Sequence, residues 1–198
     1  NNILLSPISL LVNSQGCAYA HNLITGRVRV LTGEGRKTPY LKEHSTEVAG
    51  LAENLSGDER YYNNLIVNKG LSEYDPVKLP MFMSDNVYLN GAKPSKHESG
   101  PLVLPAFDPG IKLIEKSDGM YLHINCDKEW CLHKRQLVTT ELLGKAKSPN
   151  LPYMDYDGSV LKIDTDYFGK KRNTDNPAPG PFEFTEKKAI SMKVWPKK

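Results

Sequence analysis

The sequence predicts an all-β protein in which the coils of a parallel β-solenoid are followed by a small antiparallel sheet. The main observation is a recurrence near 21 residues. An asparagine followed by two strand-forming residues appears at Asn2, Asn22, Asn64 and Asn86, at spacings of 20, 42 and 22 residues. Short β-branched runs accompany it without amphipathic helix patterns between them. A meander of antiparallel strands is the alternative, because it also gives regularly spaced strand runs.

Asparagine suits the corner of such a coil. Its backbone tolerates the left-handed region, and its side-chain amide can bond to the asparagine of the next coil. The 42-residue interval equals two steps of 21, so we expect the missing step to lie in a long excursion over residues 27–63. Loops that enlarge one coil usually lie on the binding face of a solenoid.

The composition is that of an ordinary folded protein. The chain has 198 residues, of which 39% are hydrophobic and 25% charged, and a net charge of +3. These values exclude a disordered chain. No apolar run is long enough to span a membrane, and the basic residues are scattered apart from residues 170–172 and 197–198. We therefore expect no membrane and no nucleic-acid partner. Three cysteines do not decide the redox compartment.

We divide the chain into coils over residues 1–100, including the long substrate-side loop 27–63, and a C-terminal part over residues 101–198. The loop carries the one helix pattern, a short helix after a Ser45 cap, although Gly50 costs that helix about 1 kcal/mol. Its apolar positions are Val48, Leu51, Ala52 and Leu55.

The C-terminal part is predicted to hold a small antiparallel sheet and an extended tail that packs on the coils. Prolines make residues 91–109 an extended crossing. Asp118-Gly119 between two alternating apolar runs predicts a hairpin. Val160–Ile163 predicts one more strand, and the proline-rich tail over residues 175–184 favours extended chain.

The densest group of polar and aromatic residues lies in the long loop. Arg36, Tyr40 and His44 are followed by Asp58 and Arg60. Charged donors and acceptors can hold sugar hydroxyls, and aromatic faces can hold sugar rings, so carbohydrate contact is one hypothesis. The alternative is that Asp58 and Arg60 pair across a turn while His44 only packs.

A pair of carboxylates would suit a glycosidase. Eleven residues before the corner asparagines lie Leu11, Glu53 and Asp75, which would be equivalent positions on successive coils. Glu53 and Asp75 would then stack at the spacing of neighbouring strands, about 4.8 Å. Carboxylates on an exposed face are more often simply solvated, and that alternative remains open.

No metal or cofactor site is expected. The aspartates do not form a calcium loop, and the cysteine and histidine spacing matches no structural zinc site. A glycine-rich phosphate loop is missing too. The residues considered were Asp155, Asp157, Asp164 and Asp166 for calcium, and His123, Cys126, Cys131 and His133 for zinc.

Several longer strings resemble the C-terminal portion of glycoside hydrolase family 120, the β-xylosidases. The resemblance runs from Asn1 to about Glu183. Its closing pattern, from Gly169 and Arg172 to the Pro-Gly-Pro-Phe-Glu string, also recurs in other β-helix carbohydrate enzymes. The strings are residues 2–7, 14–23, Arg36-x-Thr38-Pro39-Tyr40-x3-His44-Ser45-Thr46-Glu47, 57–64, 166–172 and 179–183.

The resemblance implies a right-handed parallel β-helix and retaining hydrolysis of xylosides by an aspartate nucleophile and a glutamate acid/base. Both catalytic residues would lie upstream of Asn1, so none is assigned within this chain. Asn1 opens directly into an apolar run, and we interpret the chain as a segment of a longer polypeptide that is inactive alone.

The expected partners are an oligosaccharide substrate and the upstream portion of the same enzyme. The expected substrate contacts are Gln15, Arg36, Tyr40, His44 and Glu53. Gln15 is included because the first coil would stack under the coil that carries the missing glutamate.

Two other functions fit the same scaffold, since a fold does not decide a chemistry. One is a β-solenoid that binds carbohydrate without turnover. The other is a polysaccharide lyase, which would need a lysine, arginine or tyrosine base near a uronate carboxylate.

Overall fold

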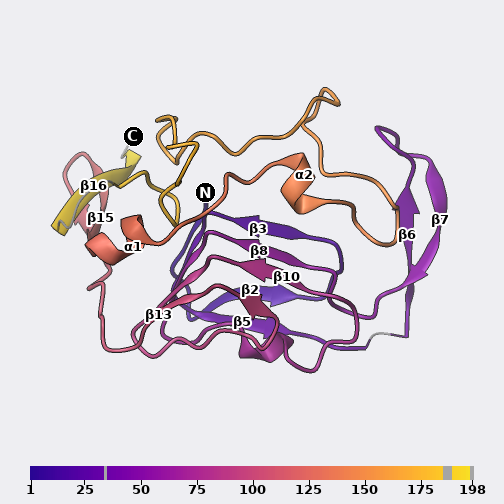
Figure 1. Ribbon diagram of the computed structural model, residues 1–198, viewed down its shortest axis with the longest axis horizontal. Coiled ribbons are helices and arrows are strands. Elements are labelled where there is room, and N and C mark those ends of the chain that lie inside the picture. The colour runs from indigo at the N-terminus through magenta and orange to yellow at the C-terminus, as the bar shows by residue number, and fades with distance from the viewer. Residues whose placement is uncertain (34, 185–188, 197–198) are drawn as a thin grey trace.

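Within the first 104 residues, successive segments of the chain add strands to the same parallel sheets, as Figure 1 shows. The computed structural model describes residues 1–33, 35–184 and 189–196. One sheet has the order β1-β4-β9-β11-β13, a second has β12-β10-β8-β3, and a third pairs β2 with β5. Every pairing within these three sheets is parallel, which confirms the predicted direction of the coils.

The strands of these sheets are short, and each sheet takes one strand from successive passages of the chain. We call each passage a coil. The first sheet contains β1 (Ile3–Leu4), β4 (Leu23–Ile24), β9 (Leu65–Val67), β11 (Val87–Leu89) and β13 (Leu102–Leu104); the second contains β3 (Ala18–Ala20), β8 (Arg60–Tyr62), β10 (Phe82–Ser84) and β12 (Glu98–Ser99); the third contains β2 (Ile8–Val12) and β5 (Arg27–Val30), and a 3-10 turn η1 (Ser72–Tyr74) follows β9.

The corner asparagines form the predicted ladder. The amide oxygen of Asn22 accepts a hydrogen bond from the backbone N–H of Asn2 at 2.8 Å, and the amide oxygen of Asn64 accepts from Asn22 at 2.8 Å. The amide oxygen of Asn86 accepts from Asn64 at 2.9 Å, and the ladder ends on Glu98. These side chains satisfy corner N–H groups that the strands leave unpaired, and those of Asn22 and Asn64 are buried.

The ladder also corrects two expectations. Asn22 bonds directly to Asn64, so the 42-residue interval is one coil enlarged by an excursion and not two coils. The left-handed residue at each corner precedes the ladder asparagine: His21, Asn63 and Asp85 have φ values of 54°, 57° and 60°. The asparagines therefore serve as hydrogen-bond partners, and the preceding residues make the bend.

Alternate residues of the first sheet face two different cores. In β9, Ile66 packs inside the coils with Tyr61 and Tyr88, whereas Leu65 and Val67 face outward. The outward side chains pack against the C-terminal part, including Leu122, Trp130 and Phe182. A sheet that is buried on both faces needs continuous apolar runs, which explains the strand sequences.

The C-terminal part covers the outer face of the first sheet. It contains the sheet β14 (Lys112–Lys116), β15 (Gly119–Asn125) and β16 (Ala189–Pro196), in which both pairings are antiparallel. Lys116 pairs with Gly119, so the predicted hairpin is confirmed. Two short helices follow β15, α1 (Lys128–Leu132) and α2 (Thr140–Leu143).

The predicted helix in the long loop is wrong. Residues Val48–Glu53 form strand β7, which pairs antiparallel with β6 (Lys37–Leu41). Gly50 explains the error, because the Tyr40 ring lies over it and an added Cβ would come within 2.5 Å of the tyrosine oxygen. Val48 and Leu51 have exposed fractions of 53% and 62%, so the apolar period did not mark a buried face.

Two expectations for the C-terminal half also need correction. The proline-rich crossing contains β12 and β13, which join the parallel sheets, so the last coil extends to Leu104. Val160 and Lys162 form isolated bridges to Met154 and Thr139, and no strand is assigned at residues 160–163. Within the described residues, no helix is long and apolar enough to cross a membrane.

Candidate functional site

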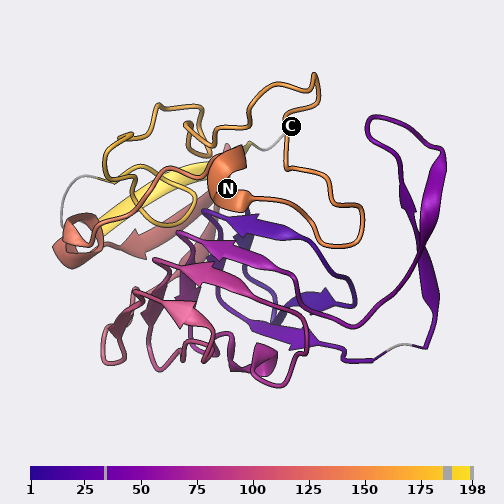
Figure 2. The same ribbon diagram turned by 45° about the vertical axis from the view of Figure 1, so that its right-hand side comes forward.

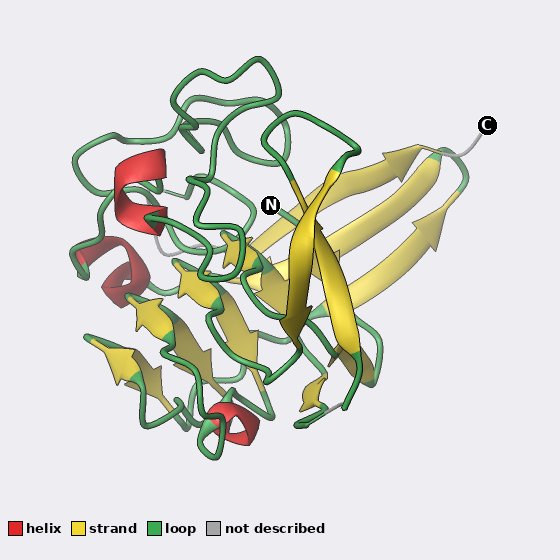
Figure 3. Cartoon of the chain, turned by 90° about the vertical axis from the view of Figure 1, so that its right-hand side faces the viewer, coloured by secondary structure: helices red, strands yellow, loops and turns green. Residues whose placement is uncertain are grey.

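The hairpin β6–β7 stands away from the coils in Figure 2, and Figure 3 views the molecule from the side of the hairpin. A cavity of about 480 Å³, here called the base groove, lies where the hairpin leaves the second coil. Its walls are the 13–16 turn, the inner face of the hairpin and the 146–149 segment. Its lining residues are Asn13, Ser14, Gln15, Gly16, Arg36, Thr38, Pro39, Tyr40, Ala52, Asn54, Ala146, Ser148 and Pro149.

The base groove brings together three of the five predicted contact residues. Gln15, Arg36 and Tyr40 all line it. His44 lines a neighbouring cavity at the tip of the hairpin. Glu53 lies on neither cavity lining. It follows Ala52 on β7, and alternation along a strand places it on the opposite face.

The predicted stacking of Glu53 on Asp75 is wrong. Glu53 pairs with Lys37 in the antiparallel hairpin and has no coil position. Asp75 follows η1 on the third coil, where its carboxylate accepts hydrogen bonds from Ser95 Oγ at 2.7 Å and from the Lys96 N–H at 2.9 Å. Counting back from the corners failed because the hairpin interrupts the second coil.

A buried ion pair anchors the wall of the base groove. Arg60 Nη1 lies 2.7 Å from Asp58 Oδ1, with both side chains almost fully buried. Arg60 also donates to the carbonyl oxygens of Leu143 at 3.0 Å and Lys145 at 2.6 Å. Asp58 Oδ2 accepts from the N–H of Lys147 at 2.7 Å. The predicted alternative, pairing of Asp58 with Arg60, is confirmed, and the pair holds the 143–147 segment in place.

Aromatic side chains enclose the same guanidinium. Its carbon lies 4.4 Å from the ring centre of Phe82 and 5.0 Å from that of Tyr153. Such contacts stabilise a buried cation. The Tyr153 hydroxyl donates to the carbonyl oxygen of Gly16 at 2.6 Å, and Gln15 Nε2 contacts Ser148 Oγ. The distant segment around residue 148 is therefore fixed against the first coil.

Sequence reasoning missed Glu59, a carboxyl group inside the coils. Its side chain is fully buried, and burial raises its pKa to about 8. Oε2 accepts from the Cys17 N–H at 3.0 Å, while Oε1 has no partner among the described residues. Alternation places Glu59 on the same side as Tyr61, toward the coil interior, and Arg60 outside. The string Asp58-Glu59-Arg60 consists of charged residues, so the local sequence did not indicate that the Glu59 side chain is buried.

We expect Glu59 to make folding stability depend on pH. Its pKa rises from 4.5 to about 8, so the native state holds the proton more tightly than the unfolded state. The contribution of Glu59 to the free energy of unfolding is complete below pH 4.5. It is lost as the pH rises through the folded-state pKa of about 8. Each pH unit in that window costs at most about 1.4 kcal/mol.

Urea unfolding across this pH window measures the effect. The Glu59→Gln variant should lose much of the decline, whereas Glu53→Gln on the exposed hairpin should keep it. Glu98, whose pKa burial raises to about 7, contributes a decline of the same sign and stays in both variants. An identical pH dependence for wild type and Glu59→Gln would contradict the assignment.

The closing string of the family resemblance forms a structural clamp. Arg172 donates to Glu183 at 3.2 Å, to the Gly180 carbonyl at 3.0 Å and to the side-chain oxygen of Asn1 at 2.8 Å. His21 lies 3.1 Å from the Ala178 carbonyl oxygen. These buried contacts tie the tail to the first coil and lie apart from the base groove.

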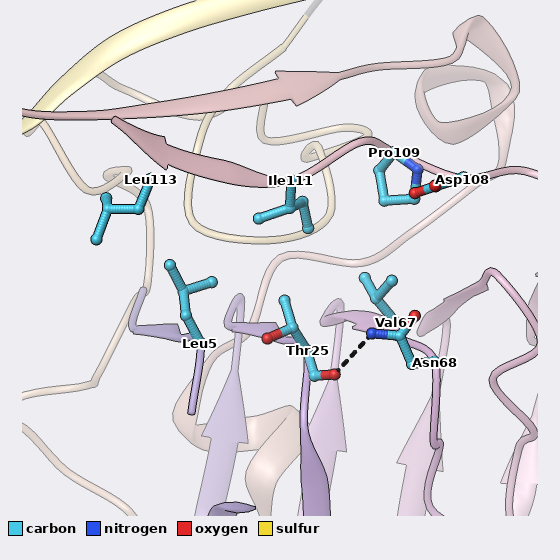
Figure 4. Close-up of a pocket in the computed structure, with 8 residues that line it drawn as sticks. All are labelled: Leu5, Thr25, Val67, Asn68, Asp108, Pro109, Ile111 and Leu113. Atoms are coloured by element: carbon cyan, nitrogen blue, oxygen red, sulfur yellow. Dashed lines mark hydrogen bonds between the residues drawn. The ribbon is translucent and has the colours of Figure 1, made fainter. Parts of the chain in front are cut away.

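A separate cavity of about 380 Å³ lies between the first sheet and β14 (Figure 4). Leu5, Ile111 and Leu113 supply apolar walls, and Asn68 Nδ2 donates to the Thr25 carbonyl at 3.0 Å. This cavity lies at the interface between the coils and the antiparallel sheet. None of the predicted contact residues lines it.

No cluster of three or more histidine, cysteine, aspartate or glutamate residues with metal-binding geometry occurs in the part of the chain that the structure describes. The side chain of Cys131, one of the residues considered for zinc, lies outside the described part.

One solved structure resembles nearly the whole chain. It is described as the complex structure of XylC with xylose, and it matches with a TM-score of 0.89 and 32% sequence identity. The chain therefore shares the fold of the matched part of XylC. The match covers 98% of this chain and 35% of the XylC chain. No family model matches this chain, and no curated protein matches it.

Proposed function

We propose that this chain is the C-terminal part of a glycoside hydrolase that acts on xylose-containing oligosaccharides. The coils would be the last turns of a right-handed parallel β-helix. The observation that supports this proposal is the similarity, over 98% of this chain, to the structure of XylC in complex with xylose. The chain spans 35% of XylC, so the proposal assigns the activity to a longer protein of which this chain is a part.

The chain would supply one wall of the sugar pocket. Arg36 and Gln15 carry donors suited to sugar hydroxyls, and Tyr40 offers an aromatic face suited to a sugar ring. All three line the base groove. The buried pair of Asp58 and Arg60 positions the opposite wall, so this part of the pocket is preorganised.

The catalytic aspartate and glutamate would lie on upstream coils and act by a retaining mechanism through a glycosyl-enzyme intermediate. Among the described residues, the two carboxyls whose pKa values are strongly raised have internal roles. Glu98 accepts from Asn86 Nδ2 at 2.8 Å and from the Tyr88 hydroxyl at 2.7 Å. Glu59 faces the coil interior. Neither is arranged to reach a sugar in the base groove.

The first coil offers a surface for an upstream coil. Strands β1, β2 and β3 each stand at one end of their sheets. A further parallel strand would add at about 4.8 Å from each of them. A cavity of about 570 Å³ beside β1, with Ile3, Leu5 and Trp195 in its lining, adds apolar surface there. This arrangement supports an upstream portion of the same enzyme as partner.

We expect Arg36→Ala in the full-length protein to lower kcat/KM for xylobiose by about fivefold to 150-fold, the equivalent of losing hydrogen bonds worth about 1–3 kcal/mol. Gln15→Ala should act in the same direction. Arg29→Ala, on the exposed side of β5, is the matched control and should leave kcat/KM unchanged.

Product analysis decides between the function classes. Xylose released with retained configuration supports the proposal. An unsaturated product from uronic-acid polymers would instead identify a lyase, and sugar binding without turnover would identify a non-catalytic binding protein. Equal kcat/KM values for wild type and Arg36→Ala would contradict the claim that the base groove is part of the sugar pocket.

A further inference from the structure

A second cavity lies next to the base groove, at the tip of the hairpin. This cavity, here called the tip groove, has a volume of about 400 Å³ and shares Tyr40 and Pro149 with the base groove. The two cavities are therefore neighbours, with Tyr40 and Pro149 in the wall of each. The tip groove is lined by Tyr40, Leu41, Lys42, Glu43, His44, Ser45, Pro149, Leu151, Pro152 and Met154.

The two walls of the tip groove differ in chemistry. The hairpin side presents the polar groups of Lys42, His44 and Ser45, and the other side presents the apolar surfaces of Pro152 and Met154. A sugar ring has the same division, with hydroxyl groups around its edge and C–H groups on its faces. A ligand site that combines an apolar wall with a few directed polar groups fits such a ring.

The hairpin tip is held in one conformation. The Lys42 N–H donates to the Glu47 carbonyl at 2.9 Å, and the Glu47 N–H donates to Ser45 Oγ at 2.9 Å. His44 adopts a left-handed backbone with a φ of 47°. Its Nε2 would lie 3.5 Å from a Cβ at Gly158, so the imidazole lies close to the turn around that glycine. These hydrogen bonds order the turn that carries His44, and a preorganised turn lowers the cost of ordering a ligand.

We propose that the tip groove is a distal subsite that binds an additional sugar ring of an oligosaccharide whose reacting end occupies the base groove. This inference rests on the proposed function and deepens it by naming the substrate class, chains longer than a disaccharide. His44 contributes hydroxyl contacts there, apart from those of Arg36 and Gln15.

Binding of thio-linked, non-hydrolysable xylobiose and xylotetraose to the full-length protein tests the proposal by calorimetry. His44→Gly removes the imidazole at a position where glycine accepts the left-handed backbone. It should weaken xylotetraose binding by about tenfold and leave xylobiose binding unchanged. Met154→Ala, on the opposite wall, should have the same selectivity and leaves the tip intact. Thr46→Ala, at the tip but outside the lining, is the control.

The outcomes separate the two claims. Equal losses for both ligands, or no loss with either variant, would overturn the distal subsite. A selective loss of xylotetraose binding supports it, whether or not the wild-type protein releases xylose. Failure to release xylose in a separate assay would overturn the proposed hydrolase alone.

Discussion

Replacing Asn64 by alanine should lower the free energy of unfolding by about 3–5 kcal/mol, since each buried polar group left without a partner costs about 1–3 kcal/mol. The amide oxygen of Asn64 accepts from the backbone and side-chain N–H groups of Asn22. Its own amide donates to Asn86 Oδ1 at 2.8 Å and to the Tyr19 carbonyl at 2.9 Å. Alanine removes all of these partners from a fully buried corner.

Urea unfolding of the full-length protein measures this loss. The matched control is Asn68→Gly at an exposed corner, where φ is 73° and glycine accepts the backbone without strain. That variant loses two exposed bonds, from Asn68 Nδ2 to the Thr25 carbonyl and from Asn90 Nδ2 to Asn68 Oδ1. Water can replace both partners, so we expect a loss below about 1 kcal/mol. Equally small losses for both variants would show that the ladder does not hold the coils together.

The Arg60→Met variant should be destabilised by about 3–5 kcal/mol, because it leaves the Asp58 carboxylate buried without its cation. It should also loosen the 143–147 segment, whose carbonyl groups Arg60 binds. We therefore expect weaker binding of xylobiose at the base groove in addition to the loss of stability. The stability of Arg60→Lys should lie between those of wild type and Arg60→Met, since one ammonium group cannot make all the hydrogen bonds of the planar guanidinium.

Two further variants isolate the cause. Arg27→Ala breaks the exposed pair of Arg27 and Glu73 and should leave the urea midpoint of unfolding nearly unchanged. Asp58→Asn combined with Arg60→Met removes the uncompensated charge and should recover part of the stability. If the double variant is as unstable as Arg60→Met and both bind xylobiose normally, the ion pair does not position the groove.

Residue identity at the corners made the coils predictable. The ladder asparagines supply buried hydrogen bonds that few other side chains can make in that geometry. The recurrence of asparagine in the sequence therefore predicted the coils. The hairpin at Asp118-Gly119 was predictable for a similar reason, because the turn demands those residues. In each case a local chemical requirement limits the sequence.

The hairpin β6–β7 could not be predicted in this way. Its apolar residues, including Val48 and Leu51, are exposed, so their spacing reports no buried face. Gly50 looked like a poor helix residue and is in fact the position over which Tyr40 packs. The period of the pattern was therefore misleading, and only the cross-strand contact explains the glycine.

The wall of the base groove depends on contacts between distant segments. Arg60 reaches the carbonyl oxygens of Leu143 and Lys145, which are more than 80 residues away in sequence. Any residue type offers a carbonyl oxygen, so no side-chain pattern marks these positions. Residue type and resemblance led to the prediction that Gln15, Arg36 and Tyr40 contact sugar, and the structure adds that all three line one cavity.

The central claim is that the base groove holds a sugar of the substrate. A crystal structure of the full-length protein soaked with xylobiose tests it most directly. The account predicts a sugar hydroxyl at about 2.7–3.2 Å from the guanidinium of Arg36 or the amide of Gln15. A bound sugar that contacts no residue of the base groove would contradict it.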